Sequence, residues 1–169
     1  MVNVAEMRPE EVILMVNYFT QSDEAYLAGM GAAKHLMPDP QAWNKRVINE
    51  ISKPDDEKGL FYVVWSVDGQ KIGHSNINHI QHGEVANMHL HMWVPQIRRQ
   101  GHGDALIKKS IQIYQERFKL KRLLCEPFAG NPAPIKTLER NGFKFVERYE
   151  TIPSTICEKQ EVVRYELTF

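Results

Sequence analysis

The chain has 169 residues and balances 21 lysines and arginines against 21 aspartates and glutamates. That length fits a single domain spanning residues 1–169, and the lack of excess positive charge disfavours nucleic acid or an anionic membrane as a partner. Two cysteines are too few for a disulfide scaffold, and neither a signal peptide nor a run of 18 apolar residues is present, so we expect a cytoplasmic protein.

Three helices are predicted in the first third of the chain. Apolar residues recur at helical spacing across residues 12–19, and Ser22-Asp23-Glu24 is a capping signal for a second helix that reaches Met30. Asp39-Pro40 opens a third helix, because aspartate caps a helix and proline suits its first turn. Residues 7–9, Met-Arg-Pro, do not predict a strand before these helices.

An antiparallel meander of three strands is predicted next. Residues 60–67 are rich in aromatic and β-branched side chains, which favour a strand. Asp68-Gly69 predicts a hairpin turn, because it supplies the positive φ values that tight hairpins need. Residues 71–80 form the second predicted strand and residues 85–94 the third.

Strands and helices alternate in the second half. A helix is predicted from Gly103 to about Arg117, then a short buried strand over residues 122–125, then a helix from Pro132 or Ala133 that Asn141-Gly142 ends. Two further strands, 143–149 and 162–169, complete an α+β or mixed α/β sandwich. We expect the last strand to lie at an exposed sheet edge, through which a homodimer would form.

A glycine-rich loop, Arg98-Arg99-Gln100-Gly101-His102-Gly103, lies between a predicted strand and a predicted helix. Glycines let a ligand approach the backbone, the first N–H groups of the helix point at an anion, and arginines bind phosphate. Leu106 stands where a dinucleotide fingerprint needs its third glycine, and the Gly-Lys-Ser/Thr of a P-loop is missing. The loop alone fits either an anion site or an ordinary strand–helix turn.

Two motifs together resemble the GNAT acyltransferase superfamily. The acyl-CoA motif of that family, Arg/Gln-x-x-Gly-x-Gly/Ala after a strand, matches residues 90–103. Its second signature, an asparagine and a helix that ends in Glu-Lys/Arg-x-Gly-Phe, matches residues 131–143. The resemblance implies an acyl-CoA motif region of about 85–143. It also implies the GNAT fold: a central, mostly antiparallel sheet with helices on both faces and a splayed strand pair at the acyl-CoA site.

The resemblance also implies an N-acetyltransferase with acetyl-CoA as the acyl donor. In the family, the pantetheine arm pairs with the end of the motif strand and the pyrophosphate lies on the amides of the glycine loop. The asparagine and the next helix flank the pantetheine, and a lysine there reaches the nucleotide phosphates. We expect the carboxylate of Asp104 to point away, because it would repel pyrophosphate. The implied cofactor-binding residues are Met92, Trp93, Val94, Arg98, Arg99, Gln100, Gly101, His102, Gly103, Asp104, Asn131 and Lys136.

Polar side chains share one face of the motif strand. Strand alternation places Asn87, His89 and His91 together and the apolar residues of 86–92 on the opposite face. A lysine-type amine has a pKa of about 10.4, so a base must take its proton, and histidine suits that task. The resemblance places the family's base on this face, where no acid stands. We therefore predict that His89 or His91 is the catalytic base, directly or through water, although strand histidines also serve in simple hydrogen-bond networks. The predicted substrate cleft comprises His74, Asn76, Asn78 and Asn87.

The residue at the family's general-acid position departs from the family pattern. Leu138 stands where many members have a tyrosine that protonates the leaving thiolate. A thiol with a pKa of about 8.5 leaves tolerably without that acid. Leucine also occurs here in the branch that acetylates the N-termini of ribosomal proteins, which the chain resembles. Tyr149 and Tyr165 are other donors or packed strand aromatics.

Two alternatives belong to other classes of protein. Gly83 and His89-x-His91 match the opening of a cupin metal site, but Pro95 and Gln96 stand where its glutamate belongs, so we expect no metal. A non-catalytic CoA-binding regulator would keep the glycine loop without gathering histidines and asparagines in a cleft. The acceptor is expected to be a small-molecule amine, a peptide N-terminus or a lysine, and the sequence does not choose among them.

Overall fold

The structure, a computed structural model, describes residues 1–97 and 101–169. Its centre is a seven-stranded sheet in the order β1-β2-β3-β4-β5-β7-β6, in which β4 and β5 are parallel and the other described neighbours are antiparallel. The strands are β1 (Val2–Glu6), β2 (Leu60–Val67), β3 (Gln70–Gln81), β4 (Val85–Met92), β5 (Arg122–Cys125), β6 (Lys144–Thr151) and β7 (Gln160–Thr168). The predicted α+β class, with a mostly antiparallel sheet, is confirmed.

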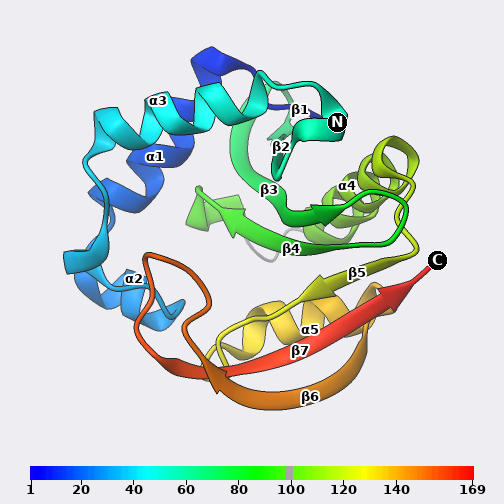
Figure 1. The fold of residues 1–169 in the computed structure, drawn as a ribbon. Helices are drawn as coiled ribbons and strands as arrows, with labels where there is room; N and C mark the ends of the chain where they lie inside the picture. Colours follow the sequence, from blue (N-terminus) through cyan, green and yellow to red (C-terminus); the bar gives the residue numbers. More distant parts are fainter. Residues whose placement is uncertain (98–100) are drawn as a thin grey trace.

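Helices cover both faces of the sheet (Figure 1). They are α1 (Val12–Gln21), α2 (Glu24–Gly29), α3 (Pro40–Ile51), α4 (His102–Phe118) and α5 (Pro132–Arg140), with short 3-10 turns at Pro9–Glu11, Lys34–Leu36, Asp55–Glu57 and Pro95–Ile97. Alternation along β2 separates two apolar clusters. Phe61, Val63 and Trp65 pack with α4, whereas Tyr62 and Val64 pack with α1 and α3. None of the helices in the described parts of the chain is long and apolar enough to cross a membrane.

The local signals in the sequence act as predicted. The Asp23 and Asp39 carboxylates accept hydrogen bonds from the amides of Tyr26 (2.7 Å) and Ala42 (2.9 Å), which caps α2 and α3. Asp68 and Gly69 join β2 to β3 with φ values of 48° and 83°. Both φ values are positive, as a tight hairpin requires.

The expectation that helices come first is wrong, because the chain begins with a strand. β1 pairs antiparallel with β2, Val2 opposite Val67 and Glu6 opposite Val63. The Glu6 carboxylate accepts a hydrogen bond from Arg117 of α4 at 2.6 Å. A five-residue edge strand with mostly exposed side chains carries little hydrophobic signal, so its partner strand and this ion pair decide its structure.

The prediction that the last strand lies at an exposed edge of the sheet is also wrong. β7 pairs with β5 on one side and with β6 on the other, so the last strand lies inside the sheet and β6 forms the edge. Phe145 and Val146 of β6 remain 59% and 47% exposed. A homodimer built through this end of the sheet would therefore use β6.

The two central strands separate along their length. β4 and β5 pair only at residues 85–87 and 122–124, and the remainder of β4 runs on without β5 beside it. Figure 1 shows the two strands diverging toward the α2 side of the molecule. This is the splayed strand pair that the sequence predicts.

Candidate active site

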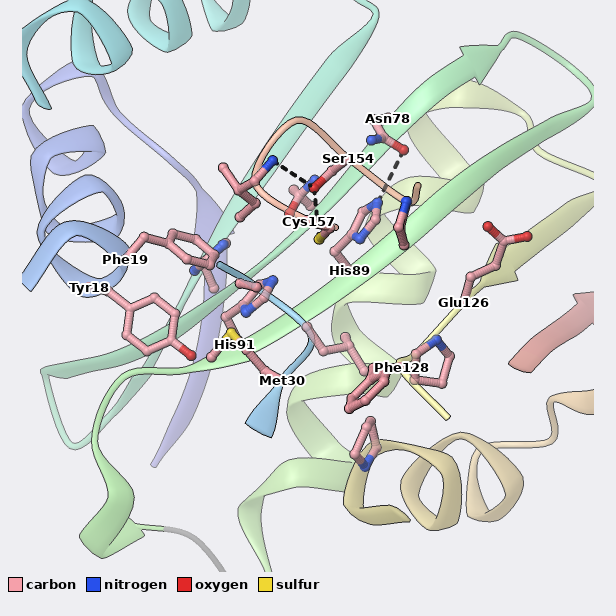
Figure 2. Close-up of a pocket in the computed structure, with 18 of the residues that line it drawn as sticks. Tyr18, Phe19, Met30, Asn78, His89, His91, Glu126, Phe128, Ser154 and Cys157 are labelled. Atoms are coloured by element: carbon pink, nitrogen blue, oxygen red, sulfur yellow. Dashed lines mark hydrogen bonds between the residues drawn. The ribbon is translucent and has the colours of Figure 1, made fainter. Parts of the chain in front are cut away.

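A cavity of about 900 Å³ lies where β4 and β5 diverge. Helices α1 to α3 form one wall, and the β6–β7 loop with the segment after β5 forms another. Strands β2, β3 and β4 form its floor, and the start of α5 closes one end. Figure 2 shows the side chains that converge on this space.

The floor gathers most of the predicted cleft residues into cross-strand pairs. His74 lies opposite His91, and Asn76 lies opposite His89. These four line the cavity together with Asn78. Asn87 faces the same side one pair further along, opposite Asn78, but is not part of the cavity lining.

His89 has polar neighbours on two sides. Its Nε2 atom lies 3.2 Å from the Oδ1 atom of Asn78, so Nε2 carries the hydrogen and Nδ1 keeps its lone pair. Burial lowers the pKa of His89 to about 4, although the Glu126 carboxylate acts in the opposite direction. Figure 2 shows Asn78 and Glu126 on different sides of the ring. His89 is therefore uncharged at neutral pH.

His91 and His74 form a packed aromatic pair. Their rings stack at 4.9 Å, and Phe19 meets the His91 ring edge-on at the same distance. The indole N–H of Trp93 donates to His74 Nδ1 at 2.8 Å. His74 Nε2 is buried and has no hydrogen-bond partner within residues 1–97 and 101–169. Burial lowers the pKa of His91 to about 3 and that of His74 well below its ordinary value.

Glu126 is a cavity residue that the sequence did not predict. It directly follows β5, and its Oε1 atom accepts hydrogen bonds from Tyr149 Oη at 2.6 Å and Arg164 Nε at 2.5 Å. Tyr149 is thus a packed strand aromatic with its hydroxyl in use, and burial raises its pKa. The available sequence signal was an acid just after the short strand that pairs in parallel with the histidine strand.

The predicted pyrophosphate loop leads into α4. Gly101 caps that helix with φ +81°, a left-handed conformation that favours glycine. At Gly103, no described atom lies within 4 Å of where a Cβ would stand. Asp104 binds Arg140 at 3.1 Å and Asn141 at 3.3 Å, so its carboxylate engages the end of α5. The predictions for Arg98, Arg99 and Gln100 lie outside the described residues.

The other predicted cofactor residues lie at the end of β4 and the start of α5. The amides of Trp93 and Val94 donate to the Ile72 carbonyl at 2.7 and 3.3 Å. Asn131 precedes α5 and lines the cavity, and Lys136 is exposed on that helix. Leu138, at the position of the family's tyrosine acid, is fully buried in the core.

Sequence and structure comparisons point to one family. The model of the Acetyltransferase (GNAT) family matches residues 31–143. No curated protein matches the sequence. Among solved structures, RimL, the ribosomal L7/L12 alpha-N-protein acetyltransferase in complex with coenzyme A, is similar with a TM-score of 0.81 and 13% identity, over 99% of this chain and 94% of that one.

Two further structures share this fold. The ribosomal-protein-S5-alanine acetyltransferase from Vibrio fischeri has a TM-score of 0.78 and 15% identity, over 99% of this chain and 92% of that one. The dodecameric spermidine N-acetyltransferase from Vibrio cholerae has a TM-score of 0.73 and 13% identity, over 99% and 93%. At such identities these structures establish a common fold.

Proposed function

Because the chain belongs to the GNAT acetyltransferase family, it is an N-acetyltransferase that uses acetyl-CoA, and we propose that it transfers the acetyl group directly to a primary amine beside His89. The observation that carries this proposal is the divergence of β4 from β5, which opens the cavity beside the strand face that holds His89 and His91. Acetyl-CoA supplies the thioester carbonyl, and the residues of the chain bind, orient and accept a proton.

The backbone near the splay would hold the cosubstrate. The amides at the start of α4, from Gly101 to Asp104, would receive the pyrophosphate, because a helix N-terminus offers unpaired N–H groups. Arg98, Arg99 and Gln100 belong to the same proposed set. Trp93 and Val94 use their amides on Ile72, and the Val94 carbonyl accepts from the Ile97 amide at 3.2 Å, so the pantetheine would pair first with the Trp93 carbonyl oxygen. Asn131 would flank the pantetheine, and Lys136 would reach the nucleotide phosphates.

His89 is the better proposed base of the two histidines. With Nε2 on Asn78, its Nδ1 lone pair is available to the attacking amine. The Glu126 carboxylate favours the imidazolium form that results. His91 is instead packed against His74 and Phe19, which suits a wall of the acceptor site.

The low pKa of His89 determines at which point of the reaction it accepts the proton of the amine. Taking a proton from a lysine-type ammonium of pKa about 10.4 would cost a base of pKa about 4 roughly 9 kcal/mol. The amine must therefore arrive uncharged, and His89 accepts its proton as the nitrogen bonds to the carbonyl carbon and becomes much more acidic. The thiolate then leaves without the family's tyrosine.

Direct attack is favoured over an acyl-enzyme on a buried thiol. Cys125 lines the cavity, but burial raises the pKa of its thiol to about 12, so it is not a ready nucleophile. The Cys125→Ala variant is accordingly expected to retain activity.

The decisive experiment measures thiol release from acetyl-CoA with a panel of amines. We expect His89→Ala to lower kcat by about 10²–10⁴-fold, the usual contribution of a general base, and His91→Ala to act mainly on KM for the amine. Thermal unfolding of both variants controls for folding. Full activity in both would refute a histidine base, and CoA binding without acetylation of any amine would indicate a regulator. The observed helix-flanked sheet is not a cupin barrel.

A further inference from the structure

Resting on this proposed function, we infer that the acceptor carries one primary amine next to an apolar, uncharged group and has no second ammonium. The neighbours of similar fold include enzymes named for ribosomal proteins and for spermidine, so the fold itself does not choose the acceptor. The side chains that line this cavity do favour one kind of acceptor.

The wall opposite the splay is aromatic. Phe19 packs on Trp43 at 5.4 Å and on His91 at 4.9 Å. The Tyr18 and Tyr26 hydroxyls are hydrogen-bonded to each other at 2.9 Å. Such a surface gains free energy by removing apolar groups from water, at about 25 cal/mol per Å².

Each carboxylate of the described lining is already paired with a cation of the chain. Glu50 accepts from the Gly59 amide at 2.9 Å and from Lys53 at 2.5 Å. Glu126 accepts from Arg164 and Tyr149 through its Oε1 atom. The remaining charged lining residue, Arg46, is positive. A polyamine would bring further positive charges without unpaired carboxylates to match them, which is costly where the cavity walls exclude water.

The histidine floor is also unsuited to several cations. Trp93 occupies His74 Nδ1, so the other nitrogen of that ring can only donate a hydrogen. His89 offers one lone pair, which the reacting amine uses. Burial keeps His74, His89 and His91 uncharged at neutral pH.

One side of the acceptor end is roofed, so distal charges on a bound molecule lose contact with water on that side. The Ala33 amide donates to the Ile156 carbonyl at 2.8 Å, and Gln160 donates to the Gly31 carbonyl at 2.9 Å. His35 and Glu158 lie 2.9 Å apart at the outer side of this bridge. Ala32 and the β6–β7 loop, held together by these bonds, thereby line one side of the cavity.

The test measures acetyl transfer from acetyl-CoA to four acceptor amines: 2-phenylethylamine, a peptide with N-terminal phenylalanine, Nα-acetyl-lysine amide and spermidine. We expect kcat/KM to be at least tenfold higher for one or more of the three monoamines than for spermidine, and the ratios among the three identify a free amine, a peptide N-terminus or a lysine side chain as the source. Preference for spermidine would overturn the inference while leaving acetyl transfer intact. If no amine is acetylated, the proposed function fails. Thermal-shift titrations with CoA present then decide the inference by whether 2-phenylethylamine or spermidine stabilises the protein more.

A charge-introducing variant tests the cause. Asn76→Asp places a carboxylate on the floor, and Met30→Glu places one on the α2 wall. At least one should raise the kcat/KM for spermidine relative to 2-phenylethylamine by tenfold or more. Asn3→Asp, the same change on exposed β1, should leave that ratio unchanged. If both cavity variants fold, as shown by thermal unfolding, and leave the ratio unaltered, the charge explanation is overturned.

Discussion

Acidification should destabilise this protein through its uncharged histidines. Burial lowers the pKa of His89 to about 4 and of His91 to about 3, and it lowers the pKa of His74 well below its usual range. In the unfolded chain each would titrate near 6.5. Between these values the unfolded state binds protons that the folded state does not. Stability is therefore complete above about pH 7 and falls as the pH drops below 6.5.

The size of the stability loss follows from the pH range between the folded-state and unfolded-state pKa values. Between pH 7.5 and 5.0, a fully buried histidine that stays uncharged costs about 2 kcal/mol of unfolding free energy. His74 is fully buried, whereas His89 and His91 partly face the cavity, so we assign those two about half of this value each. The three together predict a loss of about 4 kcal/mol, a large part of the 5–15 kcal/mol typical of a domain.

Urea unfolding at pH 7.5 and pH 5.0 measures this loss. In His91→Leu the loss should be about 1 kcal/mol smaller than in the wild type, because one proton-binding group is removed from the unfolded state. His35→Leu, on the exposed pair with Glu158, is the matched control. An identical pH-dependent loss in wild type and His91→Leu would show that His91 is protonated in the folded protein and would refute the reasoning.

Three substitutions test other features. Gly73→Ala should cost about 1–3 kcal/mol in urea unfolding, because a Cβ there would lie 2.4 Å from the His91 carbonyl oxygen, whereas Gly29→Ala meets no described atom within 4 Å and should not destabilise. Gly101→Ala should raise the KM for acetyl-CoA several-fold with little change in kcat, because φ +81° strains the capping residue by about 1–2 kcal/mol; an unchanged KM would separate this loop from the cosubstrate. Trp93→Phe should lower the unfolding free energy by about 1–3 kcal/mol, because it removes the N–H that satisfies buried His74; an unaltered stability would mean that the bond contributes nothing.

Local signals in the sequence predicted most of the elements. Asp23, Asp39 and Asp68-Gly69 determine nearby backbone geometry, so their effects are visible without the fold. Alternation on β4 likewise predicted that His89 and His91 share a polar face, because a strand has a fixed two-residue period.

The features that the sequence did not predict depend on contacts between distant segments of the chain. β1 is held by β2 and by Arg117, about 60 and 111 residues away along the chain. β6 lies outside β7 although it comes first, and no local pattern encodes that order. Glu126 enters the cavity only because β5 diverges from β4 at its carboxyl end. Each of these features follows from sheet topology.

The weak basicity of His89 makes a further demand on the acceptor. At neutral pH, an α-amine of pKa about 7.7–8.0 is uncharged several hundred times more often than a lysine side chain of pKa about 10.4. If His89 takes the proton only during attack, log kcat/KM should rise with slope one up to the pKa of each amine and show no bend near 6.5. The pH profiles of 2-phenylethylamine and a peptide α-amine should then bend at different pH values. A common bend near 6.5 for both would mean that a histidine of ordinary pKa, rather than the amine, limits the reaction.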